Sequence, residues 1–285
     1  MLVDTKPTTF EELIRISGLS HGTDVWLNNA QTLIQEGTVT LNDAICTRDD
    51  IMTYLIKQGL PPNSAFKIME TVRKGKALKD SKWPQYEELM REKNVPEWYI
   101  DSCKKIKYMF PKAHAAAYVT MAFRIAWFKV HIPKAYYSAY FSIRAKAFDA
   151  EFMIFGKEKA KAKMKEIELQ GNAAAPKDKD MYDDLEIVLE MYERGIKFLP
   201  IDLYKSDASK FLVEDDGIRP PINSIPGLGT IAAESICSEA KIGKFMTIDE
   251  LRLRTRAGNS VVELLTKFGC LDGIPQSSQI SLFDM

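Results

Sequence analysis

One block of the sequence, residues 110–144, constrains this chain more than any other because it is basic, aromatic and rich in small residues at once. From Asp101 to Lys146 the chain holds nine lysines and arginines and a single aspartate, a net charge of 9 − 1 = +8. The formal charge of the whole chain is zero. A local excess of one sign in a neutral protein favours an anionic partner, most often phosphate.

The block predicts two helices that meet at Pro133. Pro111 suits a first helical turn, where its missing N–H costs little, and an Ala-rich run follows it to Ala126. Apolar residues recur at helical steps in both segments. They are Tyr118, Met121, Ala122, Ile125 and Phe128 in the first helix, and Tyr136, Tyr137, Tyr140 and Phe141 in the second. Such stripes usually form core, and the same is expected of the lone His131.

The start of the first helix indicates a nucleotide site. Lys112 and His114 fall in its first turn, where free backbone N–H groups and the helix dipole favour an anion. Tyr118 follows one turn later and offers a ring to a base. Arg124 and Lys129 add positive charge further along the helix.

This block resembles the fingers of C-family bacterial replicative DNA polymerases. The likeness is carried by residues 110–118, Phe-Pro-Lys-Ala-His-Ala-Ala-Ala-Tyr, and by residues 123–133. Residues 17–26, 48–52 and 66–76 resemble the PolC type of DNA polymerase III alpha subunit, and the likeness continues piecemeal to the C-terminus.

The resemblance implies a C-terminal fragment that binds incoming dNTP and primer–template DNA alongside the rest of the polymerase subunit and the replisome. The parent reaction is DNA-templated nucleotidyl transfer, assisted by carboxylate-held Mg²⁺ ions. In the family the palm aspartates precede this region, and no matching pair occurs here, so the chain alone is expected to bind without polymerising. The likeness also suggests Arg48 as a triphosphate contact. Asp49 and Asp50 are more simply helix caps than metal ligands.

A basic segment and a strand pair are predicted on either side of the block. Lys74 and Lys76 belong to a cluster that continues to Lys82, which indicates a solvated edge beside DNA. The alternative is that these cations only complement a helix C-terminus.

Earlier in the chain, Asp24 is predicted to cap a helix that ends at Gly37. Residues 195–204 and 210–213 are β-prone and predict a small strand pair.

A Gly-Leu-Gly hairpin enters an Ala-rich helix near the C-terminus, the pattern of a helix-hairpin-helix. Gly227 and Gly229 permit a close backbone approach, and the N–H groups of Gly229, Thr230 and Ile231 are predicted to bind a DNA phosphate without reading sequence. The alternative is a plain tight turn. A related segment at residues 248–267 suggests a second, glycine-poorer copy.

The last residues resemble the peptide by which bacterial proteins bind the sliding clamp. Two apolar side chains would fill a pocket while a glutamine bonds at its rim. The predicted clamp-binding residues are Gln279, Ile280, Ser281, Leu282 and Phe283.

We therefore expect a mainly α protein: helical fingers, then a small α+β region with helix-hairpin-helix motifs and a flexible C-terminal peptide. The predicted domains are polymerase fingers at 1–170, a duplex-binding region at 171–274 and the clamp-binding tail at 275–285. Four scattered cysteines and the lack of a long apolar run predict a cytoplasmic protein without membrane contact. The alternative function is a non-catalytic, clamp-tethered DNA-binding module of repair or replication.

Overall fold

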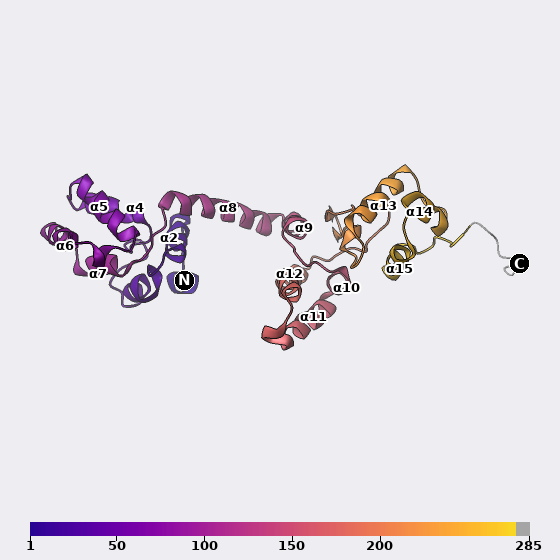
Figure 1. Ribbon diagram of the computed structural model, residues 1–285, viewed down its shortest axis with the longest axis horizontal. Coiled ribbons are helices and arrows are strands. Elements are labelled where there is room, and N and C mark those ends of the chain that lie inside the picture. The colour runs from indigo at the N-terminus through magenta and orange to yellow at the C-terminus, as the bar shows by residue number, and fades with distance from the viewer. Residues whose placement is uncertain (278–285) are drawn as a thin grey trace, which may run out of the picture. The chain divides into compact units, whose positions relative to one another are not determined.

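The computed structural model describes residues 1–277, which are mostly helical (Figure 1). The predicted mainly α fold class is confirmed. The chain forms two compact units that divide after Ile125, and each is described by itself. No helix within residues 1–277 combines the length and the apolar character that crossing a bilayer requires.

The first unit is built from short helices joined by tight turns. They are α1 (Leu2–Thr5), α2 (Phe10–His21), η1 (Trp26–Ala30), α3 (Gln31–Gln35), α4 (Arg48–Lys57), α5 (Pro62–Arg73), η2 (Ala77–Lys79), α6 (Trp83–Glu92) and α7 (Glu97–Lys105). Helix α8 (Lys112–His131) begins in this unit, one residue after Pro111.

The first turn of α2 shows how local sequence starts a helix. The Thr9 hydroxyl accepts a hydrogen bond from the Glu12 N–H at 3.2 Å, and the Glu12 carboxylate accepts one from the Thr9 N–H at 2.9 Å. This reciprocal pair satisfies two N–H groups that a helix start otherwise leaves free.

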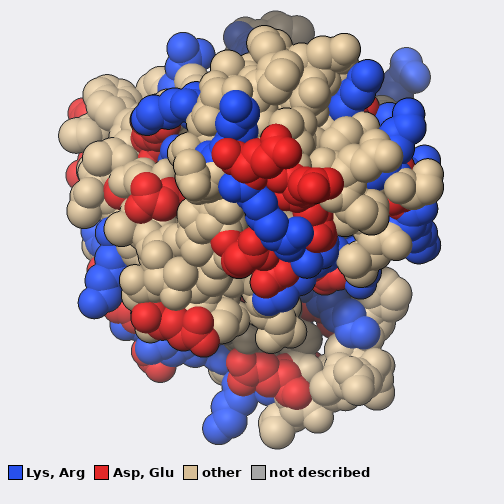
Figure 2. Space-filling view, turned by 90° about the vertical axis from the view of Figure 1, so that its left-hand side faces the viewer, with Lys and Arg blue, Asp and Glu red and all other residues tan. Residues whose placement is uncertain are grey.

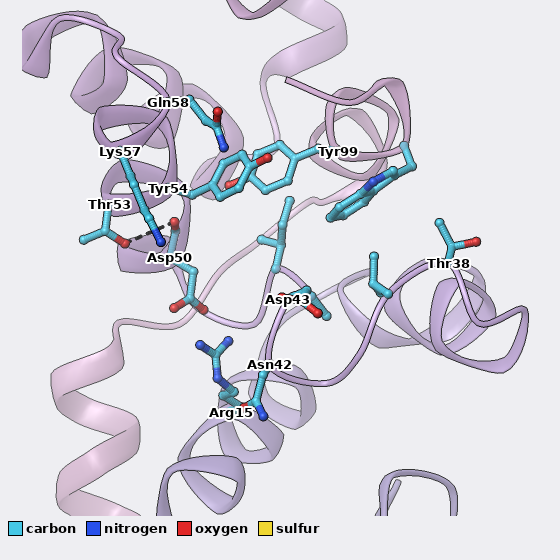
Figure 3. Close-up of a pocket in the computed structure, with 14 residues that line it drawn as sticks. Arg15, Thr38, Asn42, Asp43, Asp50, Thr53, Tyr54, Lys57, Gln58 and Tyr99 are labelled. Atoms are coloured by element: carbon cyan, nitrogen blue, oxygen red, sulfur yellow. Dashed lines mark hydrogen bonds between the residues drawn. The ribbon is translucent and has the colours of Figure 1, made fainter. Parts of the chain in front are cut away.

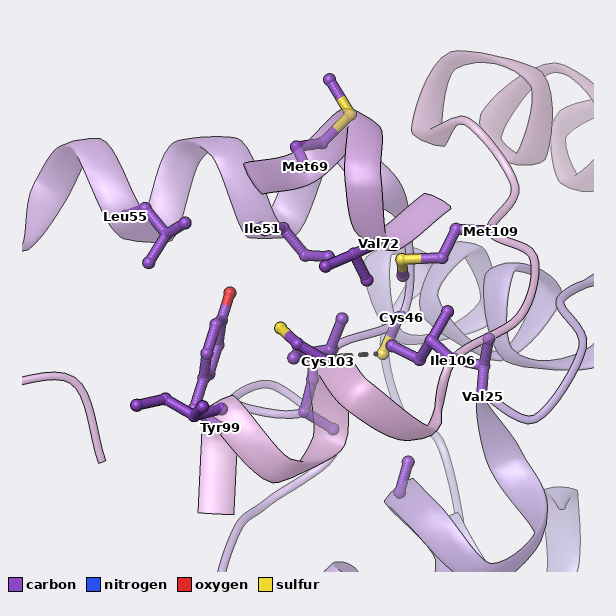
Figure 4. Packing of buried hydrophobic residues seen from close by; sticks show 14 of the residues in the cluster. Val25, Cys46, Ile51, Leu55, Met69, Val72, Tyr99, Cys103, Ile106 and Met109 are labelled. Atoms are coloured by element: carbon purple, nitrogen blue, oxygen red, sulfur yellow. Dashed lines mark hydrogen bonds between the residues drawn. The ribbon is translucent and has the colours of Figure 1, made fainter. Parts of the chain in front are cut away.

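The core of the first unit lies among α4, α5 and α7. Ile51 and Leu55 of α4 and Val72 of α5 are buried in one cluster with Tyr99 and Cys103 of α7 (Figure 4). All four cysteines of the chain are buried and unpaired. Burial raises the pKa of the Cys46 thiol to about 12, so this thiol stays protonated at neutral pH.

The regular helix predicted from Asp24 does not form. Asp24 and Asn28 both adopt left-handed φ values of 55° and 56°, and regular α-helix begins only at Gln31. The reason is a buried contact with a distant helix. The side chain of Asn29 donates to the backbone oxygens of Asp24 at 3.0 Å and Ser102 at 3.3 Å, and it accepts from the Ser102 hydroxyl at 2.7 Å.

As far as residue 277, the second unit consists of helices and one two-stranded sheet. The helices are α9 (Pro133–Ile143), α10 (Ala150–Met153), α11 (Lys157–Gln170), η3 (Gly171–Ala173), α12 (Pro176–Glu193), η4 (Ile222–Ser224), α13 (Thr230–Ile242), α14 (Ile248–Thr255) and α15 (Asn259–Lys267). The strands are β1 (Leu212–Glu214) and β2 (Gly217–Arg219).

The predicted strand pair is wrong in its partners. β1 pairs antiparallel with β2 across a two-residue turn, with Leu212 opposite Arg219 and Glu214 opposite Gly217. The earlier segment contributes one parallel bridge, between Phe198 and Ile218. In this bridge the Leu199 N–H donates to the Ile218 oxygen at 2.8 Å and the Ile218 N–H donates to the Lys197 oxygen at 3.0 Å. Pro200 follows directly and has no N–H with which to extend the ladder.

The two helices of the basic aromatic block differ in burial. In α9 Tyr137 and Phe141 are buried, as the stripe predicts. In α8 only Ala115 is buried. The side chains of Tyr118, Met121, Ile125 and Phe128 are 61%, 55%, 52% and 48% exposed. A core role for that stripe is therefore wrong in this chain. It is wrong for His131 as well, which is exposed and lies against the Trp127 ring at 4.6 Å.

Candidate nucleotide and DNA interfaces

Four rings follow one another along the start of α8. The ring centroids of His21 and Phe110 lie 5.0 Å apart in a stacked pair, and Phe110 meets His114 edge-on at 4.6 Å. The His114 ring then lies 4.4 Å from the Tyr118 ring. The sequence predicted His114 and Tyr118 as site residues, and it left His21 open between a substrate-facing residue and a solvated turn. Phe110 received no role from the sequence, because its contact with His21 joins segments about ninety residues apart.

Two carboxylates occupy the positions where the sequence predicted phosphate. The Lys112 N–H donates to Asp49 Oδ2 at 2.7 Å, so a side chain from α4 already caps the start of α8. The Lys112 ammonium lies 3.2 Å from the Glu11 carboxylate. Arg48 lies nearby, with its Nε 3.9 Å from the Asp49 carboxylate. Arg48 and Lys112 therefore meet around Asp49, each with its charge partly balanced.

The other two predicted nucleotide residues differ in their availability. Arg124 is exposed and forms no ion pair with any of residues 1–277. Lys129 belongs to the second unit, where its ammonium lies 2.7 Å from Glu190 and 5.2 Å from the centre of the Tyr136 ring.

In the folded structure, acidic residues from other segments neutralise part of the positive charge of the basic block. Five of its nine cations form ion pairs with acidic side chains from other segments. These five are Lys104, Lys107, Lys112, Lys129 and Lys146. On the face that Figure 2 presents, acidic and basic side chains likewise lie next to one another. Exposed pairs of this kind contribute little stability, so an anionic ligand can compete for the cations.

The basic segment after α5 contains one paired and one free lysine. Lys74 lies 2.9 Å from the Glu70 carboxylate, whereas Lys76 is exposed and forms no ion pair within residues 1–277. Hydrogen bonds from Arg73 and Lys74 lower the pKa of Glu70 to about 2. Lys76 is thus the more available of the two predicted DNA contacts.

The glycine hairpin forms a type II turn that leads directly into α13. The Leu228 N–H donates to the Ile225 oxygen at 3.0 Å, with Pro226 and Gly227 as the central residues. Gly227 has a φ of +86°, which a type II turn requires at that position. Thr230 and Ile231 begin the helix and are exposed, as a backbone phosphate contact needs.

A second hairpin repeats this arrangement. Gly229 precedes α13 with φ −73° and ψ 155°, and Gly258 precedes α15 with φ −75° and ψ 171°. Both glycines are exposed, and a Cβ added at either would meet nothing within 4 Å. The two helices therefore begin with the same backbone geometry, which confirms the paired arrangement expected from the sequence.

A cation from elsewhere in the chain faces the first hairpin. Lys177, at the start of α12, lines a cavity of about 380 Å³ together with residues 223–229. Its side chain is exposed. Sequence reasoning missed Lys177 because it lies in a segment that reads as a polar loop. Its position is consistent with a phosphate contact beside the hairpin.

A further pocket in the first unit contains none of the predicted nucleotide residues. It has a volume of about 510 Å³ and lies among α2, α4 and α7. Figure 3 shows Tyr54 stacked on Tyr99 at its upper edge and the Arg15 side chain directed toward Asp50. The predicted nucleotide site is by contrast an exposed surface at the start of α8.

Comparison with known proteins finds matches to two family models and to PolC-type polymerases. Residues 1–94 match the bacterial DNA polymerase III alpha subunit finger domain, and residues 195–280 match the helix-hairpin-helix motif. The chain is similar over nearly its whole length to PolC-type DNA polymerase III. It is 55% identical to that protein from Caldanaerobacter subterraneus, 56% to that from Clostridium perfringens and 54% to that from Bacillus subtilis.

Each PolC-type alignment covers 283 residues, or 99% of this chain. The chain spans only about a fifth of the length of these relatives, 19% to 20%. The finger match contains Arg48, Lys74 and Lys76, and the helix-hairpin-helix match contains both hairpins. The boundaries predicted at residues 170 and 274 stay predictions, as do the individual site residues.

The Mg²⁺ ions that the resemblance implies find no ligand set in the described structure. Within residues 1–277 no three His, Cys, Asp or Glu side chains gather in a group that could hold a metal ion. Asp49 and Asp50 both serve helix starts, since Asp50 Oδ2 accepts from the Thr47 N–H at 2.8 Å. The predicted clamp-binding residues 279–283 lie outside the described residues.

Proposed function

We propose that this chain supplies a PolC-type polymerase with its incoming-nucleotide surface and part of its duplex contact. The reaction it serves is DNA-templated nucleotidyl transfer, with Mg²⁺ held by carboxylates outside this chain. The predicted tail, Gln279–Phe283, would tether the enzyme to the bacterial sliding clamp. The similarity to PolC-type relatives along the whole chain supports this assignment.

The proposal that this chain binds the incoming nucleotide rests on the row of aromatic rings at the start of α8. A base can stack on the exposed face of Tyr118, whose ring is oriented by His114 and, through it, by Phe110. Stacking on an aromatic ring is favourable for every base, and the template then selects among them.

The cations beside these rings suit a triphosphate. The Lys112–Glu11 pair is exposed, so its small contribution is easily replaced by a contact between the ammonium and a phosphate. Arg48 can turn from Asp49 to the same ligand over a short distance. Arg124 forms no ion pair within residues 1–277 and is free to contact an anion. Lys129 belongs to the second unit and pairs with Glu190, so its contact with the nucleotide stays a prediction.

The duplex contact is proposed to use the two hairpins and the free lysine after α5. The N–H groups of Gly229, Thr230 and Ile231 offer hydrogen bonds to one phosphate, and the second hairpin offers the same backbone to another. Lys76 and Lys74 would contact phosphates as well. Because no base edge is involved, binding should be independent of sequence and should weaken steeply with salt.

The nucleotide assignment can be tested by titrating the chain with a fluorescent dNTP in the presence of primer–template DNA. We expect saturable binding that His114→Ala and Lys112→Ala weaken at least about tenfold, because each removes a base-side or phosphate-side contact. His131→Ala is the matched control, since His131 is also an exposed histidine lying against an aromatic ring of α8. Equal losses in all three variants would contradict the assignment.

The rival function, a non-catalytic clamp-tethered DNA-binding module, predicts a different result in that titration. It shares the hairpins and the tail but has no nucleotide surface. Intact DNA affinity without any dNTP binding would favour it. The four rings beside two cations favour a nucleotide surface, so we place this rival second.

The tail assignment needs a separate experiment. Deleting residues 279–283 should abolish capture of the chain by an immobilised bacterial sliding clamp while duplex affinity stays the same. A matched variant with Gln279 to Phe283 in scrambled order controls for chain length. Clamp capture that survives the deletion would remove the tether from the proposal.

A further inference from the structure

Two basic segments that are about thirty residues apart in the sequence meet in the first unit. One is the turn after α5 and the other is the end of α7. Gly75, with φ +63°, lies so close to Lys107 that a Cβ added there would sit 2.4 Å from the Lys107 carbonyl oxygen. The Met109 N–H donates to the Arg73 oxygen at 3.3 Å. The two segments thus form one wall of a pocket of about 590 Å³.

A second wall comes from the irregular turn at residues 24–29, which contributes Asp24, Leu27 and Asn28 to the lining. The buried Asn29 ties this turn to Ser102 of α7 through the hydrogen bonds described above. The left-handed backbone of Asn28 then leaves the Leu27 side chain 66% exposed at the pocket. Both walls are therefore fixed by buried or backbone contacts and do not depend on a ligand.

The pocket combines positive charge with apolar surface. Its ionisable side chains are four lysines and one aspartate, a balance of 4 − 1 = +3 in a neutral chain. The lysines are Lys79, Lys104, Lys105 and Lys107. Leu27 and the 75% exposed Leu78 provide apolar sides, and the buried Ile106 lies at the base.

Three of these lysines can reach a new anion without disturbing the core. Lys79 forms no ion pair with any of residues 1–277. Among residues 1–277, Lys105 donates only to the backbone oxygen of Asn28, at 3.1 Å. Lys107 pairs with Asp24 at 2.6 Å, but its side chain is 72% exposed and such a pair contributes little.

We propose that this pocket holds a nucleotide of the unpaired template strand, with its phosphate at Lys79 and Lys105 and its sugar and base against Leu27 and Leu78. This inference rests on the proposed function. A duplex keeps its bases stacked and offers a protein surface mainly phosphate, whereas a single strand can place an unstacked base on apolar side chains. The leucines beside the lysines therefore favour a single strand over a duplex.

Fluorescence anisotropy on two DNAs tests the proposal. One is a primer–template with a 5′ template overhang of about eight nucleotides, and the other is a blunt duplex with the same paired sequence. Lys79→Ala and Lys105→Ala should each weaken overhang binding roughly threefold to tenfold and reduce the salt slope by about 0.7, the amount expected for one phosphate contact on a single strand. Blunt-duplex binding should not change.

Two further variants separate the lysine and leucine contributions. Leu27→Ala with Leu78→Ala should weaken overhang binding at an unchanged salt slope, because no charge is removed. Lys67→Ala is the matched control, since Lys67 is an exposed α5 lysine with no ion pair in residues 1–277 and is not part of the pocket. It should behave as the unmodified chain does.

Several results would overturn the proposal. Equal losses on both DNAs would make the lysines general duplex contacts, and no loss on either would leave the pocket without this role. Displacement of the overhang by inorganic triphosphate at the pocket would show a free-phosphate site instead. If the unmodified chain binds neither DNA, the proposed function fails together with this inference. If it binds both and the lysine variants bind equally well, only this inference fails.

Discussion

Helices α8 and α9 follow one another in the chain and carry the same kind of aromatic stripe, yet one is exposed and the other buried. The Phe141 ring of α9 lies within 5.5 Å of the rings of Phe148, Phe198 and Phe211. The Tyr118 ring of α8 meets only His114 among the described rings. Periodicity thus predicts that a helix has an apolar face but not what that face contacts. A face left open is the one available to a ligand.

Phe141→Ala is the test of this contrast with the largest expected effect. Removing a ring packed among five other aromatic residues should lower the free energy of unfolding of the second unit by about 3–5 kcal/mol, measured by urea denaturation. Phe128→Ala on α8 is the matched control, with an expected change within about 0.5 kcal/mol. Comparable losses of unfolding free energy in the two variants would show that the apolar face of α8 is also buried in solution, which would contradict the difference between α8 and α9.

Tyr118→Ala tests the open face for binding. Loss of a stacked base should weaken dNTP affinity by about 1–3 kcal/mol, measured by fluorescence titration, with little change in the melting temperature. Tyr118→Phe keeps the ring and should restore binding. Tyr140→Ala, on the half-buried face of α9, should show the opposite pattern, a lower melting temperature at unchanged affinity. A Tyr118 variant that loses stability but not affinity would refute the ligand role.

A smaller effect is expected from Glu11→Gln, which releases the Lys112 ammonium from its ion pair. Affinity for the triphosphate should rise by up to about fivefold, the equivalent of an exposed pair worth about 0.2–1 kcal/mol. Glu190→Gln, which releases Lys129 in the same way, is the comparison. A gain at Lys112 alone would place the phosphates at the start of α8, and a gain at Lys129 alone would move them to its other end.

The smallest effect concerns pH near α9. Asp184 is buried beside Tyr140 and accepts from the Ala147 N–H at 2.8 Å. Burial raises the pKa of Asp184 above its ordinary value of 3.8. The folded state then holds this proton more tightly than the unfolded state. The contribution of Asp184 to stability therefore falls as the pH rises from 3.8 through the raised pKa of the folded state. Asp184→Asn should flatten this part of the plot of the free energy of unfolding against pH. An unchanged slope would show that Asp184 does not cause this pH dependence.

Local sequence was sufficient where neighbouring residues decide the structure. The Thr9–Glu12 capping box, the helix starts after Pro111 and at Pro133, and the glycines ahead of α13 and α15 follow from short-range chemistry. The mainly helical fold class follows from the same kind of pattern.

The rest depends on residues far apart in the chain. Ser102 breaks the helix predicted at Asp24 because it is the hydrogen-bonding partner of Asn29. Glu11 and Asp49 balance Lys112 from two other helices, which no count of charge along the sequence reveals. The true partner of β1 was also missed, because the turn between Glu214 and Gly217 lies just beyond the segment that looked β-prone.

The approach of Gly75 to Lys107 has a consequence for how mutations are tolerated. A single methyl group at Gly75 would collide with the backbone of a loop about thirty residues away, and its positive φ also penalises any side chain. The neighbouring Lys76 and Lys79 are exposed and form no ion pair within residues 1–277, so each can be exchanged at little cost to folding. Random mutagenesis of this segment should therefore recover many substitutions at the charged positions and almost none at the glycine.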